Sequence, residues 1–97
     1  MATLNELTID GLIDNFEFLG DWEERFSYVL DLGKRVPPMD EADLVEANKV
    51  HGCQSQVWLK SWISDDGEPR FRFIANSDAH IVNGLIAILM VIHDDKP

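Results

Sequence analysis

The segment from Ile81 to Ile92 constrains the fold of this chain more than any other, because apolar side chains occupy nearly every side of it when it is drawn as a helix. A helix of this kind must be buried on most of its faces. Asn83 and Gly84 interrupt the apolar run, which is also too short to span a bilayer. We therefore expect a core helix that lies across a sheet, and no membrane partner.

The segments before this helix alternate between apolar and polar residues, which is the period of a half-buried strand. Residues 56–64 and 70–75 form two such segments, and the Asp-Asp-Gly sequence between them is typical of a tight hairpin turn. Residues 48–50 predict a brief strand ahead of the first. Trp58 and Trp62 share one strand face and are expected to pack under a helix. The sequence thus predicts a small three-stranded antiparallel sheet packed against helices.

Two helices are predicted ahead of the strands, over residues 9–19 and 22–33. Thr8 and Asp21 precede them as N-caps, and a glycine follows or closes each helix. The segment Asn76-Ser77-Asp78 is expected to cap the last helix. This order of elements predicts an α+β fold. Apolar residues at helical spacing are expected to form the buried faces, namely Leu12, Ile13, Phe16 and Leu19 in the first helix and Trp22, Phe26, Val29 and Leu30 in the second.

The charge balance excludes one large class of partner. Acidic residues number 18 and basic residues 8, which gives a net charge of −10. Binding to nucleic acid depends on neutralising phosphates with Lys and Arg, so no nucleic acid is expected as a partner. An acidic surface favours a partner with a basic patch. The length fits one domain over residues 1–97, and the acidic N-terminus lacks a signal or transit sequence, so we expect a cytoplasmic protein.

The only cysteine, Cys53, follows Gly52 and precedes three polar residues, Gln54, Ser55 and Gln56. A cysteine that serves as a small buried hydrophobe more often has apolar neighbours. We therefore interpret this stretch as a loop that presents a thiol, followed by the strand that anchors it. One cysteine forms no intramolecular disulfide and does not by itself build a zinc site or hold a cluster. These residues fit either a reactive thiol or an unreactive loop cysteine.

Several neighbours of Cys53 admit both a functional and a structural interpretation. His51 could lower the thiol pKa or shuttle a proton, or it could simply face solvent. Asp78 and His80 open the apolar helix, where backbone N–H groups attract anions, but Asp78 could equally cap that helix. Gly52 and the polar residues after Cys53 could shape and orient the loop, or the polar side chains could only satisfy its backbone. The histidines lack paired metal-ligand spacing, so no metal is expected.

Four segments together resemble the SufE-like sulfur-acceptor family, namely Gly52-Cys53-Gln54-Ser55-Gln56-Val57-Trp58, Trp22-Glu23-Glu24-Arg25-Phe26, Leu32-Gly33-Lys34-Arg35-Val36-Pro37-Pro38 and Ser77-Asp78-Ala79-His80-Ile81-Val82-Asn83-Gly84-Leu85. They occur in the family's order and spacing, and the match covers nearly the whole chain. The resemblance implies a SufE/IscU-like fold. It also implies that Cys53 takes persulfide sulfur from a pyridoxal-phosphate cysteine desulfurase (SufS-like), stimulates that enzyme and delivers the sulfur for iron–sulfur cluster assembly.

The resemblance further implies that the cofactor and the catalytic activity belong to other proteins. Pyridoxal phosphate would belong to the desulfurase, so no cofactor is expected here, and the chain would be an accessory protein rather than a stand-alone enzyme. A cluster scaffold complex would be a further partner. Members of the family typically continue with another helical segment that carries a functional arginine. The domain is therefore expected to be shortened at its C-terminus, which would free the last helix for self-association.

Two other functions remain open from the residues alone. A metal or iron–sulfur scaffold on the same kind of fold predicts tightly bound zinc or iron. A redox-sensing thiol module predicts a thiol pKa well below the free-cysteine value of about 8.5, and a stable sulfenic acid under peroxide.

Overall fold

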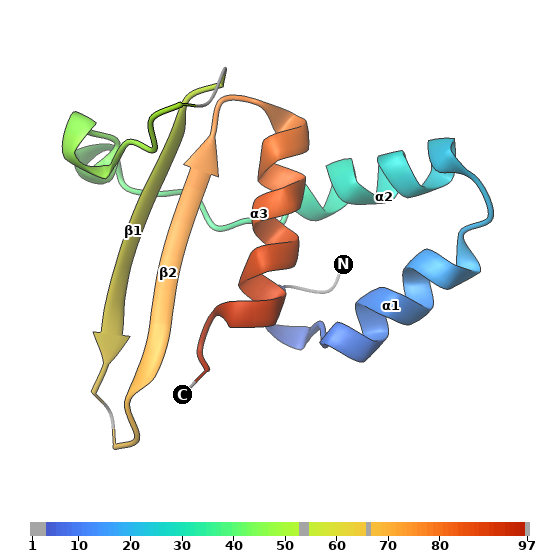
Figure 1. The fold of residues 1–97 in the computed structure, drawn as a ribbon, viewed down its shortest axis with the longest axis horizontal. Coiled ribbons are helices and arrows are strands. Elements are labelled where there is room, and N and C mark those ends of the chain that lie inside the picture. Colours follow the sequence, from blue (N-terminus) through green and yellow to red (C-terminus); the bar gives the residue numbers. More distant parts are fainter. Residues whose placement is uncertain (1–3, 53–54, 66, 97) are drawn as a thin grey trace.

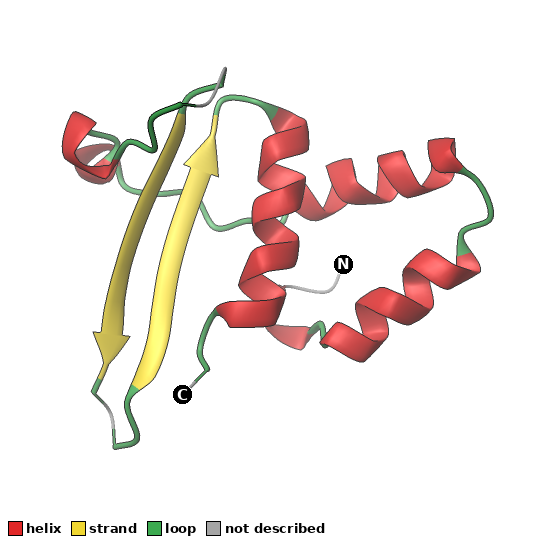
Figure 2. Ribbon diagram, viewed as in Figure 1, coloured by secondary structure: helices red, strands yellow, loops and turns green. Residues whose placement is uncertain are grey.

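The computed structural model describes residues 4–52, 55–65 and 67–96. It has the α+β organisation that the sequence predicts (Figures 1 and 2). None of the helices in these ranges is long and apolar enough to cross a membrane. The elements are α1 (Ile9–Phe18), α2 (Trp22–Gly33), β1 (Val57–Ser64), β2 (Arg70–Ser77) and α3 (His80–His93), with short 3₁₀-helices at Leu4–Glu6, Glu41–Asp43 and Glu46–Asn48.

The first two helices begin where their N-caps predict. The hydroxyl of Thr8 accepts a hydrogen bond from the backbone N–H of Gly11 at 3.0 Å. The Asp21 carboxylate accepts one from the N–H of Glu24 at 2.8 Å. Each bond satisfies one of the free donors at a helix N-terminus, so these starts are fixed by local chemistry. α1 ends at Phe18, close to its expected end.

Within the described ranges the sheet has two antiparallel strands, so the prediction of three strands is wrong. β1 and β2 pair along their whole length, with Val57 opposite Ser77. The strand expected at residues 48–50 is reduced to a single bridge between Lys49 and Trp58. A 3₁₀-helix ends directly before this bridge and a glycine with positive φ follows it, so the chain does not stay extended long enough to form a strand.

The other edge of the hairpin is covered by the chain that follows α3. The N–H of Phe71 donates to the carbonyl of Lys96 at 2.6 Å, and the N–H of Asp95 donates to the carbonyl of Phe71 at 2.7 Å. The Asp94 carboxylate accepts from the Arg72 guanidinium at 3.2 Å. This short pairing satisfies part of an edge that would otherwise be open to other chains.

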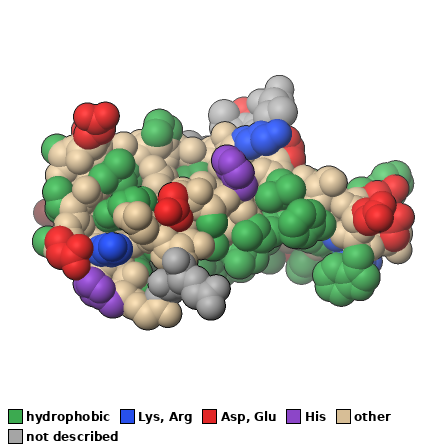
Figure 3. Space-filling view, turned by 90° about the horizontal axis from the view of Figure 1, so that it is seen from above, with side chains coloured by type: hydrophobic (Ala, Val, Ile, Leu, Met, Phe, Trp, Pro, Cys, Tyr) green, Lys and Arg blue, Asp and Glu red, His purple; other side chains and the backbone are tan. Residues whose placement is uncertain are grey.

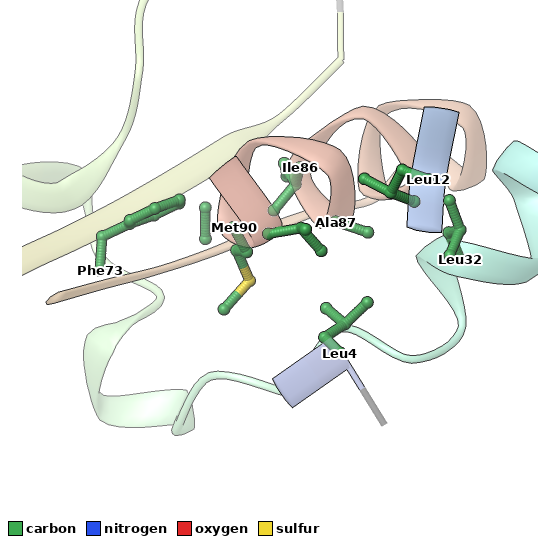
Figure 4. Packing of buried hydrophobic residues seen from close by; sticks show 9 residues of the cluster. Leu4, Leu12, Leu32, Phe73, Ile86, Ala87 and Met90 are labelled. Carbon is green, nitrogen blue, oxygen red and sulfur yellow. The ribbon is translucent and has the colours of Figure 1, made fainter. Parts of the chain in front are cut away.

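α3 lies at the centre of the molecule, between the hairpin on one side and the first two helices on the other (Figure 1). The prediction of a core helix is confirmed for the side of α3 that packs with side chains from β2, α2 and the N-terminal segment (Figure 4). The expected burial on most faces is not reached, because Ile81, Leu85 and Leu89 are exposed. The buried residues of this core are Leu4, Leu12, Leu32, Phe73, Ala75, Ile86, Ala87, Met90 and Val91.

Two glycines let α2 and α3 cross in backbone contact. A Cβ atom added at Gly33 would lie 2.7 Å from the backbone nitrogen of Gly84. A Cβ atom added at Gly84 would collide with the carbonyl oxygen of Val29 and lie 2.9 Å from its carbonyl carbon. Both neighbours are backbone atoms, which cannot rotate away as a side chain can. This crossing therefore fixes where the first turn of α3 lies relative to α2.

The predicted packing under a helix is wrong for Trp62, and Trp58 is only half-buried. The face of the hairpin that packs on α3 is the one that carries Phe73 and Ala75, and side chains alternate between the two faces of a strand. Both tryptophans lie on the opposite face. Trp62 is 43% exposed, and the Arg72 guanidinium lies 5.8 Å from the centre of its ring.

The apolar faces predicted for α1 and α2 are only partly buried. Ile13 and Trp22 are 50% and 82% exposed, and Phe26 is 53% exposed. The two helices diverge from their connection (Figure 1), and the rings of Phe16 and Tyr28, 5.2 Å apart, form a contact between them. Periodicity identified which face is apolar, but within the described residues little of the chain lies over that face. A groove of about 390 Å³ remains between α1 and α3, lined by Ile9, Leu12, Ile13, Phe16, Glu17, Arg25, Ile88 and Ile92.

Candidate functional site

The predicted thiol loop comprises residues 51–56, which we call the cysteine loop. It lies at the end of the molecule where β1 begins, β2 ends and α3 begins (Figure 1). The N–H of Val50 donates to the carbonyl of Val57 at 2.8 Å, so the two ends of the loop are joined at its base. Cys53 and Gln54 lie outside the described residues, and the residues that flank them form the described part of the site.

Gly52 stands directly before the cysteine and has a φ of +91°. L-residues rarely adopt this left-handed conformation, because their Cβ atom is too close to the backbone. His51 and Gly52 are both exposed, and a Cβ atom at residue 52 would meet nothing within 4 Å. The need for glycine here therefore comes from the backbone turn and not from crowding.

The other side of the loop is held by the segment that joins β2 to α3. The N–H of Gln56 donates to the Asp78 carboxylate at 3.0 Å, and the N–H of Asp78 donates back to the carbonyl of Gln56 at 3.2 Å. The Ser77 hydroxyl donates to the same carbonyl at 2.8 Å. These bonds fix the backbone of Gln56 in place. The preceding residue, Ser55, is half-buried.

The expected capping of α3 by Asn76-Ser77-Asp78 is wrong. The N-cap position is occupied by Ala79, which has no side-chain cap, and α3 begins at His80. The Asp78 carboxylate instead accepts from Gln56, as described above. The Asn76 side chain accepts from the N–H of Met39 at 2.6 Å and so holds the connection that follows α2. The sequence identified the polar residues correctly but assigned them to the wrong partner.

Sequence reasoning missed the role of Asn83, an amide in the first turns of the apolar helix. Its side-chain oxygen accepts from the N–H of Ser77 at 2.8 Å, and its side-chain nitrogen donates to the carbonyl of Ser77 at 2.9 Å. The signal available in the sequence was a lone amide side chain in an otherwise apolar stretch, since a partly buried polar group requires partners.

The structure places His51 beside an acidic residue. Its Nε2 atom lies 3.3 Å from a carboxylate oxygen of Glu46, and the two side chains are 70% and 75% exposed. When His51 is protonated this contact is an exposed ion pair, a kind that contributes little to stability. A role for His51 in proton transfer stays a prediction. His80 is exposed at the start of α3.

Charged side chains surround this end of the molecule, and apolar ones extend away from it. In Figure 3, which looks down on this end, charged groups are scattered around the cysteine loop, while hydrophobic side chains gather over the helices. Lys60 on β1 pairs with Asp43 at 3.2 Å and fastens the 41–48 segment beside the sheet. In the part of the chain that the structure describes, no three His, Cys, Asp or Glu side chains come together as a metal site.

Comparison with known proteins places these features in a family. A family model described as "SufE: Fe-S metabolism associated domain" matches residues 10–97. An uncharacterized SufE-like protein of Rhizobium meliloti is 48% identical over 90 residues, which cover 92% of this chain and 64% of the relative. An uncharacterized SufE-like protein of Rhizobium etli is 48% identical over 91 residues, which cover 93% of this chain and 62% of the relative. The chain thus spans less than two thirds of the length of these relatives. It belongs to the SufE family, whose domain is associated with iron–sulfur metabolism.

Proposed function

We propose that this protein is a sulfur acceptor that takes persulfide sulfur from a cysteine desulfurase onto Cys53. Membership of the SufE family carries the proposal, because the Gly-Cys-Gln-Ser-Gln-Val-Trp sequence on which the resemblance rests contains the only cysteine of the chain. The geometry around it supports the proposal. A loop whose base is closed between Val50 and Val57, and whose far side is held by Asp78, suits a thiol that must be offered to another protein.

The proposed transfer conserves atoms and electrons. Cys53 loses its thiol proton to solvent, and its thiolate attacks the outer sulfur of the donor's cysteine persulfide. A new S–S bond forms at Cys53 while the S–S bond of the donor breaks. The donor cysteine leaves as a thiolate and takes up a proton. Cys53 is oxidised to the persulfide level while the donor cysteine is reduced from that level to a thiol, so the exchange needs no external oxidant or reductant. The donor regains its free cysteine, which is how removal of the sulfur would stimulate its turnover.

The residues around Cys53 have supporting roles in this proposal. Gly52 supplies the left-handed turn that precedes the thiol, and Gln56, fixed by Asp78 and Ser77, ends the loop at a defined place. His51 is close enough in sequence to relay the thiol proton to solvent, and its Nε2 atom lies 3.3 Å from Glu46. Gln54 and Ser55 would complete the loop.

The proposed partner is a cysteine desulfurase of the pyridoxal-phosphate class, and that cofactor belongs to the partner. The net charge of −10 would speed an encounter with a basic patch on such an enzyme. The persulfide would then pass to proteins that assemble iron–sulfur clusters, in keeping with the association of this domain with iron–sulfur metabolism.

The direct test is the intact mass of the protein after incubation with the desulfurase and free cysteine. The native chain should gain the mass of one or more sulfur atoms, and the gain should disappear on treatment with a thiol reductant. The matched control is Cys53→Ser, which should gain nothing. No gain on the native chain, or an equal gain on Cys53→Ser, would defeat the proposal.

A further inference from the structure

We propose that Asn83 is a positioning residue that fixes the end of the cysteine loop at Gln56, and that this fixed end favours acceptance of sulfur by Cys53 from a protein donor. This inference rests on the proposed function and adds a residue to it. Asn83 lies on α3, away from the loop in sequence, and acts through Ser77 and Gln56.

The connection runs through two sets of hydrogen bonds. Asn83 binds both the N–H and the carbonyl of Ser77, at 2.8 and 2.9 Å, so the peptide groups on both sides of Ser77 are fixed against α3. The Ser77 hydroxyl then accepts from the N–H of Ala79 at 3.1 Å and donates to the carbonyl of Gln56 at 2.8 Å. A shift of Ser77 would therefore move the end of the cysteine loop.

The chemistry of the side chain makes asparagine suited to this role. An amide offers a donor and an acceptor on one rigid planar group, and this is what the two backbone groups of Ser77 require. An apolar residue at position 83 would remove both partners from these groups, which are part-buried. A carboxylate would keep the acceptor for the N–H but place a negative charge against the carbonyl oxygen.

The backbone of Asn83 is itself held by the rest of the fold. It directly precedes Gly84, and a Cβ atom added at Gly33 would lie 3.1 Å from the carbonyl carbon of Asn83. The contact between α2 and α3 thus runs past this residue. The Asn83 side chain therefore links Ser77, and through it the end of the cysteine loop, to the crossing of the two helices.

The effect of this arrangement depends on the size of the molecule that reacts with Cys53. A small reagent such as iodoacetamide can meet the thiolate in many loop arrangements, whereas a protein donor must meet it in one. Preorganisation lowers the barrier only when the reaction demands a particular orientation. Loss of Asn83 should therefore slow transfer from the desulfurase and leave the reactivity toward iodoacetamide largely unchanged.

The experiment compares native protein with Asn83→Ala in both reactions. For Asn83→Ala, kcat/KM for stimulation of the desulfurase should fall by about tenfold, while the iodoacetamide rate constant and its pH midpoint change by less than about twofold. Ser77→Ala removes the hydroxyl bonds to Gln56 and to the N–H of Ala79 but keeps the Asn83 side chain, and it should lower kcat/KM in the same direction. It decides the question if Asn83→Ala fails to fold by circular dichroism. Asn15→Ala is the matched control, because Asn15 bonds Tyr28 on the far helices, and it should behave as native.

Three outcomes are distinguishable. If the native protein accepts no sulfur, the proposed function fails. If the native protein accepts sulfur and the folded variants accept it equally well, Asn83 is no positioning residue. If both reactions slow by the same factor, Asn83 acts on the thiol itself and the inference is overturned.

Discussion

At the scale of single residues, the site depends on where backbone groups find their partners. Asp78 accepts from Gln56 across the gap between β1 and α3, and Asn83 binds both backbone groups of Ser77. Neither contact is between neighbours in sequence. The sequence alone therefore identified Asp78 as a candidate without its partner, and it left Asn83 unassigned.

Gly52 provides a prediction at this scale. Gly52→Ala should lower the free energy of unfolding by about 1–2 kcal/mol, because its φ of +91° is costly for a residue with a Cβ atom. The measurement is equilibrium unfolding in urea. Gly20→Ala is the control, since nothing lies within 4 Å of an added Cβ atom there and its φ is not in the positive range. Equal stability of the two variants would show that residue 52 does not need its left-handed turn.

At the scale of elements, the fold is organised by the crossing of α2 and α3. Gly84 sits where the two backbones touch, and an added methyl group would collide with the backbone of Val29. The buried residues of α3 also pack against β2. A displaced crossing of α2 and α3 would therefore disturb that contact too. The cysteine loop depends on this geometry because its end is tied to the first turns of α3.

A substitution at the crossing should show this dependence. Gly84→Ala should cost about 1–3 kcal/mol of unfolding free energy, the range found when extra volume is forced into a packed interface. The expected result in urea unfolding is a lower midpoint with an unchanged slope. Gly11→Ala is a suitable comparison, because its added Cβ atom would meet only the Thr8 side chain, at 3.2 Å. A midpoint for Gly84→Ala at or above that of Gly11→Ala would contradict the account.

The elements also show how far sequence reasoning reached. The starts of α1 and α2 were predictable because a cap and its partner lie three residues apart, as in Asp21 and Glu24. The absence of a third strand was not predictable, because the extended residues around Lys49 form a single bridge and not a continuous strand pairing. The apolar face of Trp22 was recognised correctly, but periodicity cannot say whether another element covers it.

At the scale of the whole molecule, the exposed apolar surface and the acidic net charge have opposite effects on self-association. Ile81, Leu85 and Leu89 recur on one side of α3 and are 36%, 53% and 48% exposed. Exposed apolar area of this kind favours association, whereas a net charge of −10 on each copy opposes it. Self-association through α3, expected from the exposed apolar side of this helix, should therefore depend on salt.

This balance can be measured by sedimentation velocity. The native chain should associate more strongly as ionic strength rises, because salt screens the repulsion between acidic surfaces while the apolar attraction persists. The double variant Leu85→Lys/Leu89→Lys should stay monomeric at the same concentrations. Ile63→Lys is the control for added charge, since Ile63 is 62% exposed and lies near the turn end of β1. Equal association of the double variant and the native chain would exclude α3 as the contact.

The bond between Val50 and Val57 has a consequence for how a carrier could work. It joins the two residues that flank residues 51–56, so a change of conformation within these residues need not alter the pairing of the residues outside them. Loading and unloading of cargo would then leave the strand register untouched, and the amide resonances of the hairpin would stay constant through the cycle. The sulfur donor and the sulfur recipient would then contact the same hairpin surface. Only the chemical state of Cys53, thiol or persulfide, would differ between the two encounters.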